Sequence, residues 1–448
     1  MTERTLILDC KQKVEKTVEI CGWVQVRRDH GKILFLDVAD RSGILQVVIS
    51  DTVRLEGVKA HLRGEEIHPQ DVVCIKGKVN KRPEHLINRN IPTGEIEIFA
   101  ENIEVLSKAV ELPFDMGGKE LDLQLPTLLD FRSLTLRHPK VKDIFKVQAS
   151  LLKGFRQAAD DLGCTEIVVP TIVAGATEGG AEVFKIDYFE HKAYMSQSPQ
   201  LYKQMLIPVF ERVFTIAKAY RAEPSVTTRH LTESTQMDIE VGFVKFTDLL
   251  DILEGVAGKM LKVAEEECRD ILKEFGAEKI ASGKIPRLTL REAQEVIFKE
   301  FGRDNRKEKD LTPQDEVDLC KWSFKKHDSD FVTITHFPTQ AKPFYTMPDP
   351  KNPEYSLSYD LLFRGLEILS GSQRINDYEQ LTASIKSRGM NPENFEMYLQ
   401  SFKYGMPPEG GFSFGLERVT MHVLNLANVR EASLFPRDME RVDIRLNK

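Results

Sequence analysis

Apolar and polar residues alternate over several short stretches near the start of the chain. Alternation with a period of two is typical of half-buried strands, and glycine-containing turns separate the stretches. One stretch with helical spacing, at 53–62, interrupts the series. About five strands and one helix within about 100 residues predict a small Greek-key barrel of the OB type over residues 1–106. The strands are expected at 17–26, 32–38, 43–49, 71–79 and 95–99.

Residues 107–135 show neither the alternation of a strand nor the spacing of a helix. Prolines at 113 and 126 and the pair Gly117-Gly118 interrupt this stretch. Such residues end helices and strands, so we expect a hinge between two domains here.

Residues 136–448 combine both periods. Apolar residues three or four positions apart predict helices at 144–162 and 248–275, and apolar runs predict a strand at 165–170 and two strands around a polar loop at 212–243. Strands alternate with helices to the end of the chain. We therefore expect an α+β domain built on an antiparallel sheet flanked by helices.

Composition narrows the class of protein. The 448 residues are 41% hydrophobic and 29% charged, which is typical of a soluble globular protein. No apolar run approaches the roughly 18 residues of a membrane-spanning helix. The first residues carry charges and no long apolar segment, so we predict no secretory signal, no membrane contact and a cytoplasmic location.

Charge and cysteine content exclude two further classes. Lysine and arginine total 62 against 69 acidic residues, so a net charge of −7 argues against a general nucleic-acid coat and leaves room for a local basic patch. The six cysteines contain no Cys-x-x-Cys pair. We therefore expect buried reduced thiols rather than a zinc or thioredoxin-like centre.

The common phosphate-binding loops are absent: the chain has no Gly-x-x-x-x-Gly-Lys-Ser/Thr and no Gly-x-Gly-x-x-Gly. A nucleotide would have to be held by another device. Fixed arginines are the obvious one, because a guanidinium group meets two phosphate oxygens at once.

Four segments carry candidate chemistry, and each has a simpler alternative. Arg221 and Glu223 follow an apolar strand on one face, although an exposed hairpin with an ion pair would look the same. A glycine-rich run at 410–415 leads into a helix with Arg418 in its first turn, and its glycines would let a ligand approach the backbone. The stretch 364–374 offers oxygen ligands, or is a strand after a glycine turn.

The fourth segment contains a glycine pair at 179–180 and, further on, Lys203 in an uncharged stretch. The glycines suggest a loop that closes over a substrate. The alternative is a solvated lysine at the start of a helix.

Taken together, the order of these segments resembles the class II aminoacyl-tRNA synthetases, subclass b. The helix ending at 166–170 resembles motif 1, the segment from Tyr220 to Glu240 resembles motif 2, and 415–418 resembles motif 3. Within that class the chain resembles the aspartyl-tRNA synthetases of the archaeal and eukaryotic type over nearly its whole length. Stretches that carry this likeness are 176–180, 198–204, 341–345, 370–374 and 434–438.

The chain departs from that family in two places. The motif 2 loop contains Pro224–Val226 where more polar residues are usual, which affects expectations about contacts with the tRNA acceptor end. The hairpin at 80–94 resembles the anticodon domain of the bacterial enzyme. This chain has no room between motifs 2 and 3 for the large domain that the bacterial enzyme carries there.

The resemblance implies an ATP-dependent ligase that forms aspartyl-adenylate and transfers aspartate to tRNA(Asp), with Mg²⁺ and as a homodimer. It implies catalytic roles for Arg221 and Arg418, with ATP contacts from Arg221, Glu223, Arg229, His230, Leu231, Glu367, Gly415, Leu416, Glu417 and Arg418. Mg²⁺ would lie on Glu367 and Ser370. Aspartate would contact Glu178, Gln200, Lys203, Arg221, Asp238, Ser370 and Arg374.

The barrel would bind the anticodon. Phe35 would stack on a base, and Arg28, Gln46 and Glu95 would contact base edges. A basic cluster is consistent with phosphate contacts; it contains Lys76, Lys78, Lys81, Arg82 and Arg89. His30 stands where the bacterial-type domain commonly has leucine in specific enzymes and histidine in relaxed ones, so tRNA(Asn) is a second expected substrate. The alternative is that His30 is a solvated turn residue without a base contact.

Four rivals remain. An asparaginyl-tRNA synthetase shares the fold, but Lys203 would face a neutral amide there and lose its partner. A lysyl enzyme would need an acidic pocket. A non-catalytic paralogue is expected to have lost Arg221, Glu367 or Arg418, and a related asparagine synthetase would lack the barrel.

Overall fold

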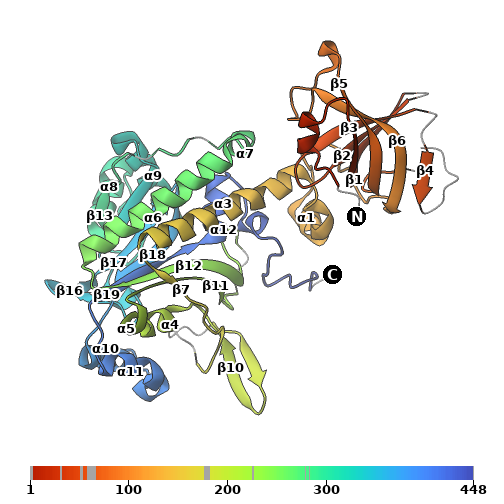
Figure 1. Ribbon diagram of the computed structural model, residues 1–448. Helices are drawn as coiled ribbons and strands as arrows, with labels where there is room; N and C mark the ends of the chain where they lie inside the picture. Colours follow the sequence, from red (N-terminus) through yellow and green to blue (C-terminus); the bar gives the residue numbers. More distant parts are fainter. Residues whose placement is uncertain are drawn as a thin grey trace. The chain divides into compact units, whose positions relative to one another are not determined.

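The computed structural model describes residues 4–30, 33–50, 54–57, 67–175, 182–224, 227–277, 279–281 and 283–446 (Figure 1). The chain forms two compact units, Met1–Leu123 and Gln124–Lys448. The division falls within the hinge predicted at 107–135, whose own limits stay a prediction.

The first unit is a barrel whose apolar residues, alternating along each strand, fill the interior. Its sheet runs β3-β2-β1-β5-β6, and a parallel pairing of β3 with β6 closes it. The predicted five-stranded OB barrel is confirmed. The strands are β1 (Thr17–His30), β2 (Ile33–Ala39), β3 (Ile44–Ser50), β5 (Val72–Lys81) and β6 (Ile96–Ser107).

The helix predicted at 53–62 is wrong in the part that the structure describes. Strand β4 (Arg54–Gly57) lies there and pairs in parallel with β6, from Asn102 to Val105. The pairing with a neighbouring strand overrides the local helical spacing. Residues 58–62 lie outside the described residues.

The prediction of reduced thiols is wrong for two of the six cysteines. Cys21 on β1 stands directly opposite Cys74 on β5, with the Cα atoms 4.0 Å apart, and the two form a disulfide. The other four, Cys10, Cys164, Cys268 and Cys320, are free and buried. Strand register brings together two residues that are 53 positions apart, and the sequence alone does not show that register.

The second unit is built on an eight-stranded sheet in the order β13-β14-β17-β18-β19-β12-β11-β7. Neighbouring strands are antiparallel except at the two edges, where β13 pairs with β14 and β7 with β11 in parallel. The α+β prediction is confirmed. The strands are β7 (Thr165–Glu166), β11 (Arg212–Tyr220), β12 (Glu233–Gly242), β13 (Arg287–Thr289), β14 (Phe331–Thr335), β17 (Ser358–Phe363), β18 (Leu366–Gln373) and β19 (Glu409–Gly415).

Two long helices, α3 (Pro139–Asp161) and α6 (Phe246–Glu267), lie side by side on one face of this sheet (Figure 1). A side chain at Gly154 would come within 2.7 Å of the Met260 Cα, so glycine is what allows this close crossing. Both helices end earlier than predicted. The chain continues after α3 into β7, and a short helix, α7 (Arg269–Glu274), follows α6.

The remaining helices and strands of the second unit lie outside this sheet. They are α1 (Leu125–Asp130), α2 (Arg132–Thr135), α4 (Gln200–Met205), α5 (Ile207–Phe210), α8 (Leu290–Phe301), α9 (Pro313–His327), α10 (Tyr378–Ser387), α11 (Glu396–Lys403), α12 (Leu416–Val423), β8 (Ile172–Val173), β9 (Lys185–Tyr188), β10 (His191–Met195), β15 (Pro348–Asp349) and β16 (Asn352–Ser356). None of the described helices is both long and apolar enough to cross a membrane.

Candidate active site

The face of the sheet opposite α3 and α6 is polar because strand residues alternate between faces. On β12, Met237, Ile239 and Val241 belong to the core beneath the helices. The residues between them, Asp238 and Glu240, therefore project to the other face, in line with Gln236 and Ser234.

Strand register extends Asp238 into a row of polar residues across four strands. Asp238 on β12 stands opposite Ser413 on β19, Ser413 opposite Ser370 on β18, and Ser370 opposite Asp360 on β17. Ser413 Oγ donates to Asp238 Oδ2 at 3.0 Å, and Ser370 Oγ donates to Asp360 Oδ1 at 2.6 Å. Lys342 Nζ, 3.0 Å from Asp360 Oδ2, contributes a cation at this end of the row.

The row of residues next to this one explains why β19 contains glycines. Gly411 stands opposite Glu240, and a Cβ at Gly411 would lie 2.4 Å from Glu240 Oε2. A side chain at Gly410 would similarly meet Leu249. These glycines make room for the protein's own side chains, so the expectation that they admit a ligand is wrong for both. Gly415 differs, because its nearest contact is with Arg418 at 3.7 Å and it lines the pocket described below.

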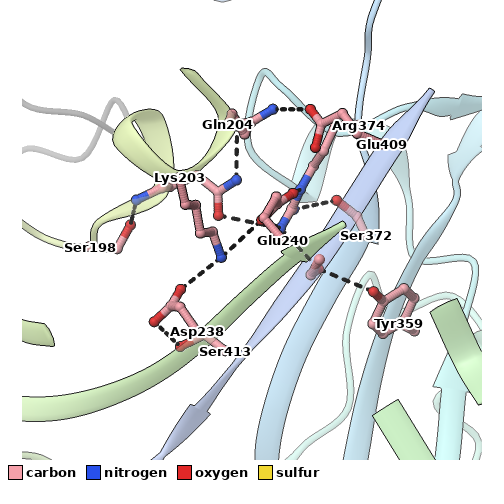
Figure 2. A network of polar contacts seen from close by, with 12 residues as sticks. Ser198, Lys203, Gln204, Asp238, Glu240, Tyr359, Ser372, Arg374, Glu409 and Ser413 are labelled. Atoms are coloured by element: carbon pink, nitrogen blue, oxygen red, sulfur yellow. Dashed lines mark hydrogen bonds and ion pairs between the residues drawn. The ribbon is translucent and has the colours of Figure 1, made fainter. Parts of the chain in front are cut away.

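Lys203 on α4 is buried, with only 1% of its surface exposed. Its Nζ lies 2.7 Å from Asp238 Oδ1 and 3.1 Å from Glu240 Oε2 (Figure 2). The alternative of a solvated lysine is therefore wrong. Burial raises the pKa of Asp238, an effect that the nearby Lys203 ammonium group opposes.

Arg374, which follows β18, is held beside Lys203. Its Nε donates to Glu240 Oε1 at 2.7 Å and its Nη2 to Glu240 Oε2 at 3.2 Å, a two-pronged contact (Figure 2). Burial alone would raise the pKa of Glu240, but Arg374 and Lys203 lower it to about 2. The predicted neighbours Gln200, Lys203, Asp238 and Arg374 thus lie in one buried cluster.

A cavity of about 220 Å³ lies next to this cluster, over the same face of the sheet. Its lining combines guanidinium groups, carboxylates and small polar residues, a composition suited to a charged ligand. Of the predicted site residues it contains Arg221, Glu223, Arg229, His230, Leu231, Glu367, Ser370, Gly415, Glu417 and Arg418.

The carboxylates at one side of the cavity favour a cation. Burial and the nearby Asp360 carboxylate raise the pKa of Glu367, and burial and Glu367 raise the pKa of Glu316 to about 7. Arg418 Nη1 is 4.0 Å from Glu367 Oε2, too far to neutralise it fully. Within the described ranges no group of three or more His, Cys, Asp or Glu residues could hold a metal by itself. Glu367 and Ser370, which line the cavity, offer a carboxylate and a hydroxyl oxygen, and Mg²⁺ accepts such oxygen donors when phosphate oxygens complete its shell.

Several predicted residues have partners within the protein. Leu416 is buried in the core under α12 and does not line the cavity. Glu417 accepts hydrogen bonds from the backbone N–H of Thr235. Arg229 Nη1 lies 3.3 Å from Glu316 Oε2. Burial and the Arg418 charge lower the pKa of His230, which favours the neutral imidazole. Glu178 lies outside the described residues.

Sequence reasoning gave no role to Glu240, Asp360, Gln204 or Glu409. Glu240 had a visible signal, since it lies two residues after Asp238 on the same strand face. Gln204 follows Lys203 directly and projects into the same cluster. Asp360 and Glu409 had no signal in the sequence. Only strand register places Asp360 beside Ser370 and Glu409 beside Glu240.

The barrel brings some of its predicted residues together. Arg28 Nη1 donates to Asp37 Oδ2 at 2.7 Å, and its Nη2 lies 3.3 Å from Gln46 Oε1. Gln46 Nε2 donates to Glu97 Oε2 at 2.9 Å. These residues form a polar row across β1, β2, β3 and β6.

The other predicted barrel residues take no part in these hydrogen bonds, although Phe35 on β2 stands directly opposite Arg28 on β1. The His30 and Phe35 rings meet edge to face, with centroids 5.7 Å apart, and His30 is exposed. Glu95 pairs with Lys11 at 3.1 Å and does not join Arg28 and Gln46. A contact of any of these with RNA stays a prediction.

Family comparisons define the class. Residues 124–439 match the family described as tRNA synthetases class II (D, K and N), and residues 18–106 match the OB-fold nucleic acid binding domain. The chain belongs to the class II tRNA synthetases of the D, K and N group, as its motifs predicted.

Individual proteins of this family are similar to the chain over nearly its whole length. The chain is 41% identical to an aspartate–tRNA(Asp/Asn) ligase of Thermus thermophilus, covering 98% of this chain and 99% of that one. It is 38% identical to an aspartate–tRNA(Asp) ligase of Pyrococcus furiosus, covering 95% and 96%. Its fold matches an asparaginyl-tRNA synthetase from Pyrococcus horikoshii complexed with asparaginyl-adenylate, with a TM-score of 0.89 and 30% identity over 99% and 100% of the two chains.

Proposed function

We propose that this protein attaches L-aspartate to tRNA in an ATP-dependent reaction that passes through aspartyl-adenylate. The observation that carries the proposal is the buried pair of cations, Lys203 and Arg374, beside a cavity lined by Arg221 and Arg418. Two cations that keep their own carboxylate partners can also bind the carboxylate of an anionic side chain. A neutral amide side chain would satisfy their hydrogen-bond donors less well.

In the first step the α-carboxylate of aspartate attacks the α-phosphate of ATP, and pyrophosphate leaves. The protein supplies position and charge, so no covalent nucleophile is needed. Arg221 would hold the α-phosphate and the attacking carboxylate, and Arg418 the far phosphate. Glu367 and Ser370 would hold Mg²⁺, which would supply positive charge that offsets the charge of the phosphates.

The remaining pocket residues would select the amino acid. Lys203 and Arg374 would face the side-chain carboxylate, Asp238 would orient Lys203, and Gln200 would lie beside them. Glu178 would bind the ammonium group. In the second step the terminal adenosine hydroxyl of tRNA attacks the carbonyl carbon of aspartyl-adenylate, the aspartyl ester forms, and AMP leaves.

The alternative, an asparaginyl-tRNA synthetase, draws support from the fold match to such an enzyme. The buried Lys203 argues against it, because its ammonium and the Arg374 guanidinium bind a carboxylate oxygen more strongly than the oxygen of a neutral amide. The two functions separate in one assay, in which purified tRNA(Asp) and tRNA(Asn) are each charged with aspartate and with asparagine. Charging with asparagine alone would replace the proposed function by its alternative.

Synthesis of aminoacyl-tRNA for translation would place the protein in the cytoplasm.

We also propose that both tRNA(Asp) and tRNA(Asn) are substrates. Their anticodons differ at the third base, C against U, and a neutral imidazole offers one donor and one acceptor that can meet either edge. Specific enzymes of the bacterial type carry leucine at this position, so leucine is compatible with tRNA(Asp). We therefore expect His30→Leu to lower aspartylation of tRNA(Asn) by about tenfold, the effect of losing one hydrogen bond, and to leave tRNA(Asp) within a few-fold.

The control for this prediction is His191→Leu, which changes an exposed histidine in the other unit. Initial rates with both transcripts measure the effect. A wild-type protein that rejects tRNA(Asn) a thousandfold, or equal losses with both tRNAs, would contradict the role of His30.

The edge of the sheet at β7 supports a homodimer. Val168, just after the edge strand β7, is 98% exposed. An exposed apolar side chain beside a sheet edge is typical of a protein interface. We expect Val168→Asp to convert the dimer to monomer in sedimentation analysis, whereas Val110→Asp, at an exposed valine of the other unit, leaves it dimeric. A wild-type monomer would refute the proposal.

A further inference from the structure

Glu409, the first residue of β19, is a fully buried carboxyl group for which the reaction above has no role. It lies next to Gln204, Glu240 and Arg374 (Figure 2). Buried carboxyl groups are either paired with a cation or protonated, so its protonation state has to be decided.

The direction of each hydrogen bond around Glu409 follows from Arg374, which can only donate. Arg374 Nη2 donates to Gln200 Oε1 at 3.3 Å, so the amide nitrogen of Gln200 faces away and donates to Gln204 Oε1 at 2.9 Å. Tyr398 Oη donates to the same oxygen at 3.1 Å. Gln204 must therefore present its amide nitrogen to Glu409, and it donates to Glu409 Oε1 at 2.7 Å.

Glu409 Oε2 is therefore the last atom in this series of hydrogen bonds. Within the described part of the protein no donor reaches this oxygen. Its neighbour on this side is Glu240: Glu409 lies two residues before Gly411, which stands opposite Glu240, and a side-chain hydrogen bond links the two carboxyl groups. Glu240 already accepts hydrogen bonds from Arg374 and lies 3.1 Å from Lys203 Nζ, so it is the ionised member of the pair. Two carboxylates in contact cannot both be ionised without a cation between them.

We infer that Glu409 is a protonated positioning residue, whose O–H donates to Glu240 and so closes a ring of hydrogen bonds that fixes Arg374. The ring runs from Arg374 through Gln200, Gln204 and Glu409 to Glu240, and back to Arg374. The role in positioning rests on the proposed function, in which Arg374 faces the substrate carboxylate.

Charge balance supports the same assignment. The groups that face Glu409 are Glu240 on β12, Arg374 after β18 and Tyr398 on α11, with Lys203 on α4 and Asp238 beyond Glu240. With the proton on Glu409, the two cations balance Asp238 and Glu240, and the pocket is neutral before substrate binds. Burial and the neighbouring Glu240 carboxylate raise the pKa of Glu409 well above its ordinary value. A third negative charge would repel an anionic substrate.

The test compares Glu409→Gln with Glu409→Leu. Glutamine reproduces both hydrogen bonds of the protonated acid, because its oxygen can accept from Gln204 and its nitrogen can donate to Glu240. We expect Glu409→Gln to keep kcat/KM for aspartate within about threefold in pyrophosphate exchange. Leucine removes both bonds, and we expect about a tenfold or larger rise in KM for aspartate with little change in KM for ATP.

An infrared difference spectrum between wild type and Glu409→Gln gives a readout that needs no substrate. We expect the wild-type protein to show the C=O stretch of one buried carboxylic acid that the variant lacks. Identical spectra, or a Glu409→Gln protein as impaired as Glu409→Leu, would overturn the inference. A wild-type protein that does not activate aspartate would overturn the proposed function, and the spectrum would still decide the protonation state.

Discussion

Replacing Lys203 by methionine is expected to abolish most aspartate activation. The substitution keeps an unbranched side chain of similar length and removes the charge that faces Asp238 and Glu240 at 2.7 and 3.1 Å. Truncating one partner of a buried charge pair costs about 2–5 kcal/mol in binding. At about 1.4 kcal/mol for each factor of ten, kcat/KM for aspartate should fall by about 30-fold to several thousandfold.

Pyrophosphate exchange at varied aspartate and ATP concentrations measures this effect. The control is Lys218→Met on β11, where the lysine is exposed and pairs with Glu233 at 3.4 Å, and which should retain normal rates. The KM for ATP should change little in both variants, because Lys203 does not line the nucleotide cavity. A Lys203→Met protein within a few-fold of wild type would show that this cluster does not bind the substrate side chain.

Removal of a cavity arginine is expected to have a comparable effect on adenylate formation. Arg221→Ala and Arg418→Ala each remove a guanidinium group from the site where charge develops during phosphoryl transfer. Loss of one such preorganised group typically lowers kcat by about 10²–10³-fold. Arg418→Lys, which keeps the charge without the planar fork, should fall between wild type and alanine.

Single-turnover formation of aspartyl-adenylate at saturating ATP measures this step. Arg306→Ala is the matched control, since Arg306 pairs with Asp304 and Glu295 on the surface and does not line the cavity. Binding of tRNA should persist in all variants, because the OB-fold match lies in the other unit. Normal adenylate yield from Arg221→Ala or Arg418→Ala would remove that residue from the proposed reaction.

Much of the fold was predictable because it rests on local patterns. Alternation along 17–26 and 43–49 identified barrel strands, and the spacing of apolar residues identified α3. Local patterns failed where a distant partner decided the outcome. Residues 54–57 form a strand because β6 offers a free edge, and the helix expected at 248–275 divides at Cys268.

The candidate site was predictable to the extent that its residues stand in recognisable motifs. Arg221, Glu223 and Arg418 were found in this way, and the structure places all three around one cavity. Leu416 was misplaced because a motif names consecutive residues, whereas consecutive residues of a helix point to different sides. Leu416 therefore faces the core, while Gly415 and Arg418 face the cavity.

The sequence by itself determined which chemical groups are available: the arginines in place of a phosphate loop, the lysine in an uncharged stretch, and the order of motifs that defines the family. Tertiary structure alone decided how those groups are paired. Strand register places Cys21 opposite Cys74 and Asp360 opposite Ser370, and the pairing of β19 with β12 brings Glu409 beside Glu240. The physical reason is that register and burial depend on contacts between residues far apart in the chain, and the charge of a buried carboxyl group depends on which neighbours those contacts supply.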